Sequence, residues 1–411
     1  MAKLFVEDLA LNGKKVISRV DFNVPIKDGK VDNDKRIRAS LPTIQYILDQ
    51  GASLILMSHL GRPDGLVKPE FSLKPAADRL GELLGKDVKF VGDCVGAEVD
   101  AAAAALQPGE VLVLENLRFH VEETGKGVDA AGNKVAADAD KVKAFRAALT
   151  KLADVYVNDA FGTAHRDHSS MTGVELPERA CGYLLKKEID FLGEALKAPE
   201  KPFVAVIGGA KISGKIDVIE ALLPKVDKLI IGGAMANTFY KAQGKEIGTS
   251  LCEDERIEMA KDLLAKGGDK IQLPVDCGVV KEMDFGARTC SDITYVDAGA
   301  IPADQMAIDA GPKSVEIFSD IVKGAKTVVW NGPMGVFEIA ESAKGTFGVA
   351  EALAAATANG AITIIGGGDS VSAIEKANLS DKVSHVSTGG GASLEYLEGK
   401  ELPGVVALTE K

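Results

Sequence analysis

The sequence predicts an α/β protein made of two doubly wound, parallel-sheet (Rossmann-like) domains joined by a hinge helix. Short β-branched apolar runs recur along the chain and are nearly continuous, as expected for strands buried on both faces of a parallel sheet. Helical patterns separate these runs, which is typical of βα units. The length of 411 residues is too great for one ordinary hydrophobic core, so two domains are expected.

The first half of the chain shows this alternation clearly. Its predicted strands are "KVISRV" near residue 15, "SLILMS" near 53, "VKFV" at 88, "VLVLE" at 111 and "DVYV" at 154. The segment "FSLKPAADRLGELLG" has a helical pattern, and "DAAAAAL" predicts a helix because alanine is the best helix former. Residues 121–140 are polar and glycine-rich, which indicates a surface insertion. We assign residues 1–185 to an N-terminal domain.

A second domain follows a charged amphipathic segment. The stretch "YLLKKEIDFLGEALKAPEKPF" predicts a helix that ends in a proline-containing link, so residues 186–200 are assigned as interdomain helix and linker. The strands predicted after it are "FVAVIGG", "KLIIGG", "IQLPVD", "TVVWNG" and "AITIIGGG", with helical patterns such as "DVIEALLPKV" and "ALAAATANGA" between them. We assign residues 201–391 to a C-terminal domain.

Composition excludes several classes of partner. The formal net charge of -12 and the lack of a long basic run argue against nucleic acid. No apolar run approaches the roughly 18 residues of a transmembrane helix, and the first residues lack the apolar core of a secretory signal. The cysteines are scattered, which indicates free thiols in a reducing, cytoplasmic compartment; Cys94 is interpreted as a turn residue rather than a reactive thiol. Small molecules are therefore the expected partners.

Polar and basic residues follow the predicted strands of the first half, where open α/β sheets bind ligands. They occur in "RVDFNVP", "SHLGRP", "LENLRFH" and "NDAFGTAHRDHSS", and Arg36 precedes a helical pattern. The planar fork of arginine suits phosphate and carboxylate, so the set predicts a site for a small polyanion. Solvated surface arginines remain the alternative, as does an ordinary hydrogen-bonded role for His59. A zinc site at His165 and His168 would lack further nearby ligands.

In the second half, the predicted strands end in glycine-rich turns. These are "GGAK", "GGAM", "NGPMGVFE", "GGGDS" and "STGGGAS". Glycine lets backbone N–H groups approach a phosphate closely, and helix N-termini add a favourable field. A single such turn is commonly only a tight connection, but the set predicts a nucleotide site. We find no G-x-G-x-x-G with a downstream acidic partner, which counts against a dinucleotide fold.

The stretch "VIGGAKISGKIDVIEALL" nearly matches the phosphate loop G-x-x-x-x-G-K-[ST], but Ile216 stands where a Ser or Thr would hold magnesium. If a helix starts near Lys211, Lys211 and Lys215 share one face of it, and an anion would offset their charge near the helix start. Two solvated lysines are the alternative. Magnesium must then be held elsewhere, and Asp369 in "GGGDS" is a plausible oxygen ligand that is also compatible with a helix N-cap.

With these motifs assembled, the chain resembles the phosphoglycerate kinase family over essentially its whole length. The shared motifs, in order, are "RVDFNVP", "SHLGRP", "LENLRF", "NDAFGTAHR", "GGAKISGKI", "WNGPMGVFE", "GGGDS" and "STGGGASLEYLEGKELPG". The resemblance implies reversible phosphoryl transfer from 1,3-bisphosphoglycerate to MgADP, giving 3-phosphoglycerate and MgATP. It also implies Mg²⁺ as cofactor, a monomer, closure of the two domains, and a segment 392–411 that packs back on the N-terminal domain.

The resemblance also assigns site residues. The substrate residues it implies are Asp21, Phe22, Asn23, Arg36, His59, Leu60, Gly61, Arg62, Arg118, His165 and Arg166. The nucleotide residues it implies are Lys215, Gly232, Gly233, Asn331, Glu338, Gly367, Gly368, Asp369 and Ser370, with Asp369 serving the metal. Arg36, Lys211 and Lys215 would be catalytic, with Arg36 and Lys215 stabilising the transferred phosphoryl group from opposite domains. The near-match to a phosphate loop is then coincidental.

Two rival functions share parts of this pattern. A two-domain NAD-dependent dehydrogenase would have the same α/β alternation, but it needs the dinucleotide fingerprint that is missing from the sequence. A non-catalytic binding protein could use the same fold, but it would have no need of both phosphate-binding residue sets.

Overall fold

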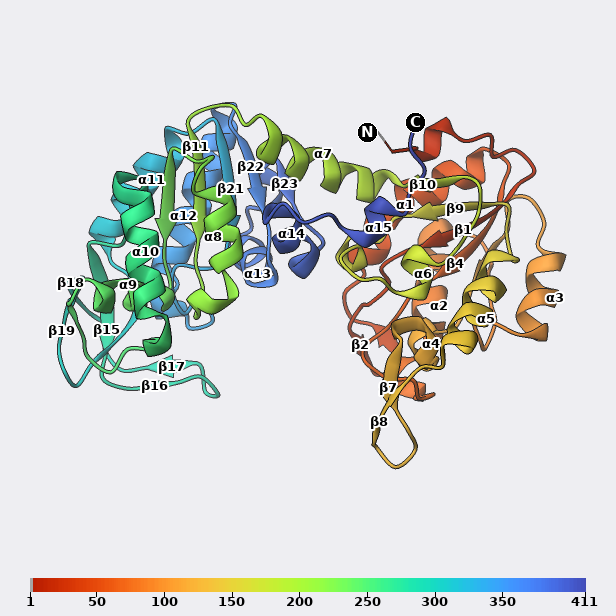
Figure 1. Ribbon diagram of the computed structural model, residues 1–411, viewed down its shortest axis with the longest axis horizontal. Coiled ribbons are helices and arrows are strands. Elements are labelled where there is room, and N and C mark those ends of the chain that lie inside the picture. The colour runs from red at the N-terminus through yellow and green to blue at the C-terminus, as the bar shows by residue number, and fades with distance from the viewer. Residues whose placement is uncertain (1–2) are drawn as a thin grey trace. The chain divides into compact units, whose positions relative to one another are not determined.

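The computed structural model describes residues 3–411, except for the side chain of Glu194. The chain forms two compact units (Figure 1). Unit 1 runs to Ile189 and also includes Glu401–Lys411, whereas unit 2 comprises Asp190–Lys400. Each unit has its own six-stranded parallel sheet covered by helices, so the predicted fold class of two doubly wound α/β domains is confirmed.

The sheet of unit 1 has the strand order β10-β9-β1-β4-β6-β5, and every neighbouring pair is parallel. Its strands are β1 (Lys15–Arg19), β4 (Ser53–Met57), β5 (Val88–Phe90), β6 (Val111–Val113), β9 (Val155–Asn158) and β10 (Arg179–Cys181). The helices are α1 (Lys35–Asp49), α2 (Lys74–Leu84), α3 (Ala97–Ala105), α5 (Ala139–Thr150) and the short α6 (Ser169–Thr172). A small hairpin joins β2 (Ile26–Lys27) to β3 (Lys30–Val31).

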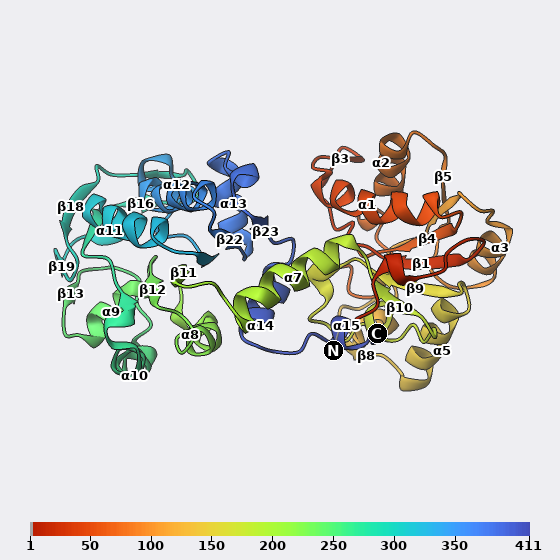
Figure 2. The same ribbon diagram turned by 90° about the horizontal axis from the view of Figure 1, so that it is seen from above.

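Helices cover both faces of this sheet. Figure 2 shows α1 and α2 on one face and α5 on the other. Every residue of β4 is buried, which agrees with its continuous apolar sequence. Helix α5 begins where Asp138 accepts hydrogen bonds from the N–H groups of Asp140 and Lys141, a typical N-cap.

The sheet of unit 2 has the order β14-β12-β11-β21-β22-β23 and is also parallel throughout. Its strands are β11 (Phe203–Ile207), β12 (Lys228–Ile231), β14 (Ile271–Gln272), β21 (Thr327–Asn331), β22 (Ile362–Ile365) and β23 (His385–Val386). The helices are α8 (Ile216–Leu222), α9 (Met235–Ala242), α10 (Ile257–Gly267), α11 (Pro312–Lys323), α12 (Lys344–Ala358), α13 (Gly368–Lys376) and α14 (Gly390–Leu397). Helices α11, α12 and α13 lie on one face, and α8, α9 and α10 on the other (Figure 2).

Unit 2 also contains small strands outside the main sheet. An antiparallel sheet joins β18 (Thr294–Asp297), β15 (Asp276–Val280) and β20 (Met306–Ala310). Short pairs join β13 (Glu246–Ile247) to β19 (Ala300–Ile301) and β16 (Met283–Asp284) to β17 (Thr289–Cys290). The run "IQLPVD" is therefore not one strand, because Pro274, which has no N–H to donate, separates β14 from β15 in a different sheet.

The chain passes from unit 1 to unit 2 within helix α7 (Tyr183–Lys197), which lies where the sequence predicts an interdomain helix. The start of α7 is anchored in unit 1. Asp159, which is fully buried, accepts hydrogen bonds from the N–H groups of Leu184 (2.9 Å) and Leu185 (3.1 Å) through Oδ1.

The end of the chain packs on unit 1, but the return begins after Lys400 rather than at residue 392. Helix α14 still belongs to unit 2, because it packs on α8 and buries Ala392 and Leu397. Beyond it, α15 (Pro403–Val406) contacts unit 1: the Gly404 N–H donates to the Ala164 carbonyl at 2.8 Å.

The predicted surface insertion at 121–140 is only partly on the surface. It contains α4 (Val121–Thr124) and a hairpin of β7 (Lys126–Val128) with β8 (Lys134–Ala136). The hairpin is largely exposed, but Glu123 is 1% exposed. The prediction of a surface segment is therefore wrong for α4, because the Glu123 carboxylate is buried and accepts hydrogen bonds from Ser170. Across residues 3–411, no helix is long and apolar enough to cross a bilayer.

Candidate active site

The polar loops of unit 1 meet at the carboxyl edge of its sheet, as predicted from their positions after successive strands. Asn23, which follows β1, accepts a hydrogen bond from the Gly61 N–H at 2.9 Å through Oδ1. Arg118, which follows β6, donates from Nη1 to the Gly61 carbonyl at 2.8 Å. The loops after β1, β4 and β6 are thus hydrogen-bonded to one another around Gly61.

Arg36 is held in place by Asp21. It lies in the first turn of α1, and its Nη1 atom lies 2.8 Å and 3.0 Å from the two carboxylate oxygens of Asp21. The Arg36 side chain remains 41% exposed, so its other donors are free to reach a ligand. The pair therefore presents an oriented guanidinium group at the carboxyl edge of the sheet.

The histidines of this region are surrounded by positive charge. Burial, followed by the neighbouring charges of Arg19 and Arg118, holds the pKa of His59 well below its usual value. Burial and Arg166 lower the pKa of His165 to about 4. All these rings are neutral at pH 7, so the positive potential of the site comes from its arginines.

Arg118 also shows how densely positive this region is. Burial, with the neighbouring charges of Arg19 and Arg62, lowers the pKa of Arg118 to about 10, while Glu123 acts in the opposite direction. Arg62 and Arg166 are exposed. The arginine cluster, defined here as Arg19, Arg36, Arg62, Arg118 and Arg166, is therefore suited to bind an anion with several charges.

Two buried residues of this region were missed from the sequence. Arg19, at the end of β1, is completely buried, and its Nε donates to Ser170 Oγ at 2.8 Å. Ser170 in turn donates from Oγ to Glu123 at 2.6 Å, and its N–H donates to the other Glu123 oxygen at 2.9 Å. An arginine inside the apolar run "KVISRV" was the available signal for Arg19, whereas nothing in the polar segment distinguished Glu123.

This buried network fixes the tautomer of His59. Arg19 Nη2 lies 3.1 Å from His59 Nδ1, and a guanidinium group can only donate. His59 Nδ1 must therefore accept, which leaves the ring proton on Nε2. The buried arginine thereby turns His59 into a neutral donor at its Nε2 end.

Three residues predicted at this site act through the backbone or through packing. The side chains of Phe22 and Leu60 belong to the hydrophobic core, so only their backbone groups are available to a ligand. Gly61 has φ +61°, and a Cβ there would lie 2.4 Å from the ring of Phe71. Only glycine fits this turn without strain. Within the described residues, no group of three potential metal ligands includes His165 or His168, so the zinc alternative gains no support.

In unit 2, three glycine-rich turns touch one another at the carboxyl edge of the sheet. Gly233 has φ +69°, and a Cβ there would lie 2.5 Å from the Gly209 carbonyl oxygen and 3.0 Å from the Pro333 carbonyl oxygen. Gly232, just before it, donates its N–H to the Ile207 carbonyl at the end of β11. The lack of side chains allows the turns after β11, β12 and β21 to pack this closely.

Lys215 lies at the start of α8, but Lys211 does not share its helix face. The helix begins only at Ile216, and Lys211 has an extended backbone (φ -132°, ψ 128°), because a short 3-10 turn separates the two lysines. Lys211 is exposed. Lys215 donates from Nζ to Asn331 Oδ1. Burial lowers the pKa of Lys215, against the opposing charges of Asp369 and Glu398.

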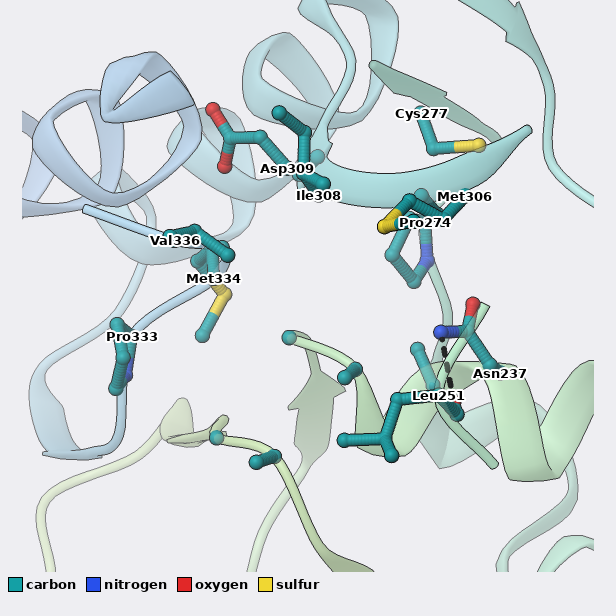
Figure 3. Close-up of a pocket in the computed structure, with 18 of the residues that line it drawn as sticks. Asn237, Leu251, Pro274, Cys277, Met306, Ile308, Asp309, Pro333, Met334 and Val336 are labelled. Atoms are coloured by element: carbon teal, nitrogen blue, oxygen red, sulfur yellow. Dashed lines mark hydrogen bonds between the residues drawn. The ribbon is translucent and has the colours of Figure 1, made fainter. Parts of the chain in front are cut away.

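A cavity of about 340 Å³ opens beside these turns (Figure 3). Its lining includes Gly233, Glu338 and Asp369 from the predicted set. Most of the wall is apolar and was not predicted; the labelled apolar side chains include Leu251, Pro274, Met306, Ile308, Met334 and Val336. Such a cavity suits a flat apolar ring system, with polar groups at its mouth.

The remaining predicted residues surround the N-terminus of α13. Gly367 occupies the N-cap position, so Asp369, in the first turn of the helix, is not the cap. Ser370 is buried and accepts a hydrogen bond from the Gly332 N–H through Oγ. Gly368 and Asp369 are exposed. The Asp369 carboxylate, exposed at the cavity wall beside Lys215, fits the oxygen-ligand preference of Mg²⁺.

Comparisons with known proteins agree with this geometry. The family model described as phosphoglycerate kinase matches residues 6–400. The chain is 55% identical to phosphoglycerate kinase from Gallus gallus, over 99% of this chain and 98% of that protein. It is 54% identical, with the same coverage, to phosphoglycerate kinase 1 from Homo sapiens.

Solved structures give the same result for the fold. Phosphoglycerate kinase from Coxiella burnetii has a TM-score of 0.85 and 40% identity, covering 98% of both chains. Phosphoglycerate kinase from Pyrococcus horikoshii OT3 has a TM-score of 0.81 and 32% identity, again covering 98% of both chains. These similarities extend over both units.

Proposed function

The chain belongs to the phosphoglycerate kinase family, and we propose here how its two units divide the reaction. The reaction is the reversible transfer of a phosphoryl group from 1,3-bisphosphoglycerate to ADP, which gives 3-phosphoglycerate and ATP in glycolysis. Unit 1 binds the bisphosphoglycerate, and unit 2 binds the nucleotide. The observation that carries this assignment is the contrast between an arginine cluster on one unit and an apolar cavity beside glycine turns on the other.

On unit 1, the arginines neutralise the substrate. Arg36, oriented by Asp21, faces the transferred phosphoryl group, while Arg62, Arg118 and Arg166 bind the carboxylate and the remaining phosphate. His59 and His165 serve as neutral hydrogen-bond donors because their pKa values are low. The backbone groups of Phe22, Leu60 and Gly61, with the Asn23 side chain that accepts from the Gly61 N–H, hold the loops together around the ligand.

On unit 2, the apolar cavity takes the base, and the glycine turns take the phosphates. The N–H groups of Gly367 and Gly368 and the Ser370 hydroxyl lie at the start of α13, where the helix dipole favours negative charge. Gly232, Gly233 and Asn331 shape the adjoining turns. A carboxylate repels phosphate, so Glu338 at the cavity wall accepts instead from the ribose hydroxyls. The exposed Lys211 draws in the phosphates.

Magnesium fits the same site. The Asp369 carboxylate would hold Mg²⁺ directly or through water. When bound with the nucleotide, the ion neutralises phosphate charge. The half-buried Lys215 ammonium, near Asp369, stabilises the negative charge of the phosphoryl group being transferred.

The transfer itself requires positioning rather than a general base, because the leaving group is a carboxylate. Arg36 and Lys215 stabilise the equatorial oxygens of the phosphoryl group in the transition state. The substrates held by the two units must meet in line, so each turnover includes closure of the units and exclusion of water.

Binding calorimetry with two variants tests the division of labour. Arg166→Ala is expected to lower the affinity for 3-phosphoglycerate about 10- to 100-fold, which corresponds to the loss of one charged hydrogen bond. The affinity for MgADP should not change. Lys215→Ala is expected to do the reverse. The assignment is wrong if either variant weakens the other unit's ligand as strongly as its own.

We further propose a cytoplasmic monomer. The five cysteines are free thiols, which persist in a reducing compartment. Light scattering after gel filtration tests the oligomeric state, and a dimer mass at micromolar concentration would contradict the proposal.

A further inference from the structure

A second group of potential ligands lies in the loops after β5 and β6 of unit 1. Asp93 and Cys94 follow β5, and His120 follows the short turn after β6. The loops touch, since the Glu115 N–H donates to the Asp93 carbonyl at 3.2 Å. One ligand atom from each of Asp93, Cys94 and His120 lies within 4.8 Å of the others, and Asp93 Oδ1 is 2.7 Å from His120 Nε2.

The surroundings favour a cation. Cys94 is 1% exposed, and its sulfur lies among the ligand atoms of Asp93 and His120. A carboxylate beside a buried sulfur attracts a positive ion. The side chains of His120 and Asp93 are 28% and 48% exposed, so an ion can reach the group from solvent.

We propose that Asp93, Cys94 and His120 form a zinc site. A thiolate, an imidazole and a carboxylate are the ligand types of Zn²⁺, and three protein ligands leave one position for water. Mg²⁺ prefers oxygen ligands, so the site differs in chemistry from the one at Asp369.

Binding exchanges protons for the metal. The Cys94 thiol releases its proton to solvent as the Zn–S bond forms. His120 loses to solvent the Nε2 proton that it donates to Asp93, takes up a proton on Nδ1, and ligates through the Nε2 lone pair. The Asp93–His120 hydrogen bond is replaced by two bonds to the ion. Because the ligands come from two loops, the bound ion ties the loop after β5 to the loop after β6 and raises the thermal stability of the protein.

The test uses the full chain stripped with chelator and titrated with ZnCl₂ by calorimetry and with CoCl₂ by absorption. We expect one tight ion per chain, a thiolate-to-cobalt charge-transfer band, proton release, and a higher Tm with zinc. Cys94→Ala should abolish the charge-transfer band and weaken zinc at least tenfold. Cys277→Ala removes another buried cysteine and should change neither the charge-transfer band nor the zinc affinity.

His120→Gln provides a second variant in case the buried Cys94 substitution unfolds the protein. It should weaken zinc at least tenfold while the chain remains folded by circular dichroism. Unchanged zinc affinity in folded His120→Gln overturns the proposal, as does a charge-transfer band that survives in Cys94→Ala. A stripped wild-type chain that binds no zinc overturns it as well, and the group is then an Asp–His hydrogen bond beside a buried thiol.

Discussion

Replacing Glu123 by alanine is expected to destabilise unit 1 severely. Glu123 is 1% exposed, and Arg19, to which it is linked through Ser170, is fully buried. Removing the carboxylate leaves a buried guanidinium charge without its anion and the Ser170 N–H without its acceptor. Leaving a buried charge uncompensated in this way costs about 3–5 kcal/mol in the free energy of unfolding.

Glu122→Ala is the matched control for this substitution. Glu122 is the preceding residue of α4, it is partly exposed, and its side chain has no hydrogen bond within the described structure. We expect its effect to stay within about 0.5 kcal/mol. Urea unfolding followed by far-UV circular dichroism measures both variants.

The difference between the two variants decides the question. If Glu123→Ala costs less than about 1 kcal/mol more than Glu122→Ala, the buried network does not stabilise the fold as described. An isosteric Glu123→Gln variant separates charge from shape, since the amide can still accept from Ser170. It should recover part of the lost stability.

The other predictions concern a turn, a buried acid and the cavity. Gly61→Ala should lower the free energy of unfolding by about 2–4 kcal/mol, because alanine adds left-handed backbone strain and a clash with Phe71. Gly13→Ala, at φ +72° with open space around it, should cost only the backbone strain of about 1–2 kcal/mol. Equal losses of the two variants in urea unfolding would contradict this reasoning. Burial raises the pKa of Asp159 to about 7, so the folded state retains a proton that the unfolded chain releases near pH 4. The contribution of Asp159 to the free energy of unfolding therefore falls as the pH rises from about 4 to 7. The Tm of Asp159→Asn relative to wild type should therefore rise across that window and then level off; a flat difference would show that Asp159 titrates normally. Leu251→Ala should weaken MgADP several-fold with little loss of stability, because this side chain lines the cavity but is 52% exposed; unchanged calorimetric affinity would place the base elsewhere.

The fold class was predictable because each strand of the parallel sheets is a local apolar run. The small antiparallel sheet of unit 2 was not, since its strand β18 is mostly exposed and has no continuous apolar run. Pro274 is a local sign that the chain leaves the parallel sheet there. Helix starts were also uncertain. The four-residue spacing of Lys211 and Lys215 fits a helix that starts near Lys211, yet the helix begins only at Ile216.

The candidate site likewise has residues that were predictable from the sequence and residues that were not. Arginines and glycines at strand ends are visible in the sequence, because the carboxyl ends of parallel strands meet at one edge. Glu123 was hidden because its burial depends on Ser170 and Arg19, which lie far away in the chain. The apolar cavity wall was hidden because Leu251, Ile308 and Met334 are ordinary apolar residues until the fold brings them together.

The most direct test of the account is a coupled assay. Purified protein receives 3-phosphoglycerate and MgATP, and glyceraldehyde-3-phosphate dehydrogenase with NADH reports the 1,3-bisphosphoglycerate formed. We expect NADH loss that requires both substrates, and a kcat lower by roughly 10²-fold in folded Arg36→Ala and in folded Lys215→Ala. Full kcat in either variant would contradict the role assigned to that residue, and no NADH loss with the folded wild-type protein would contradict the account as a whole.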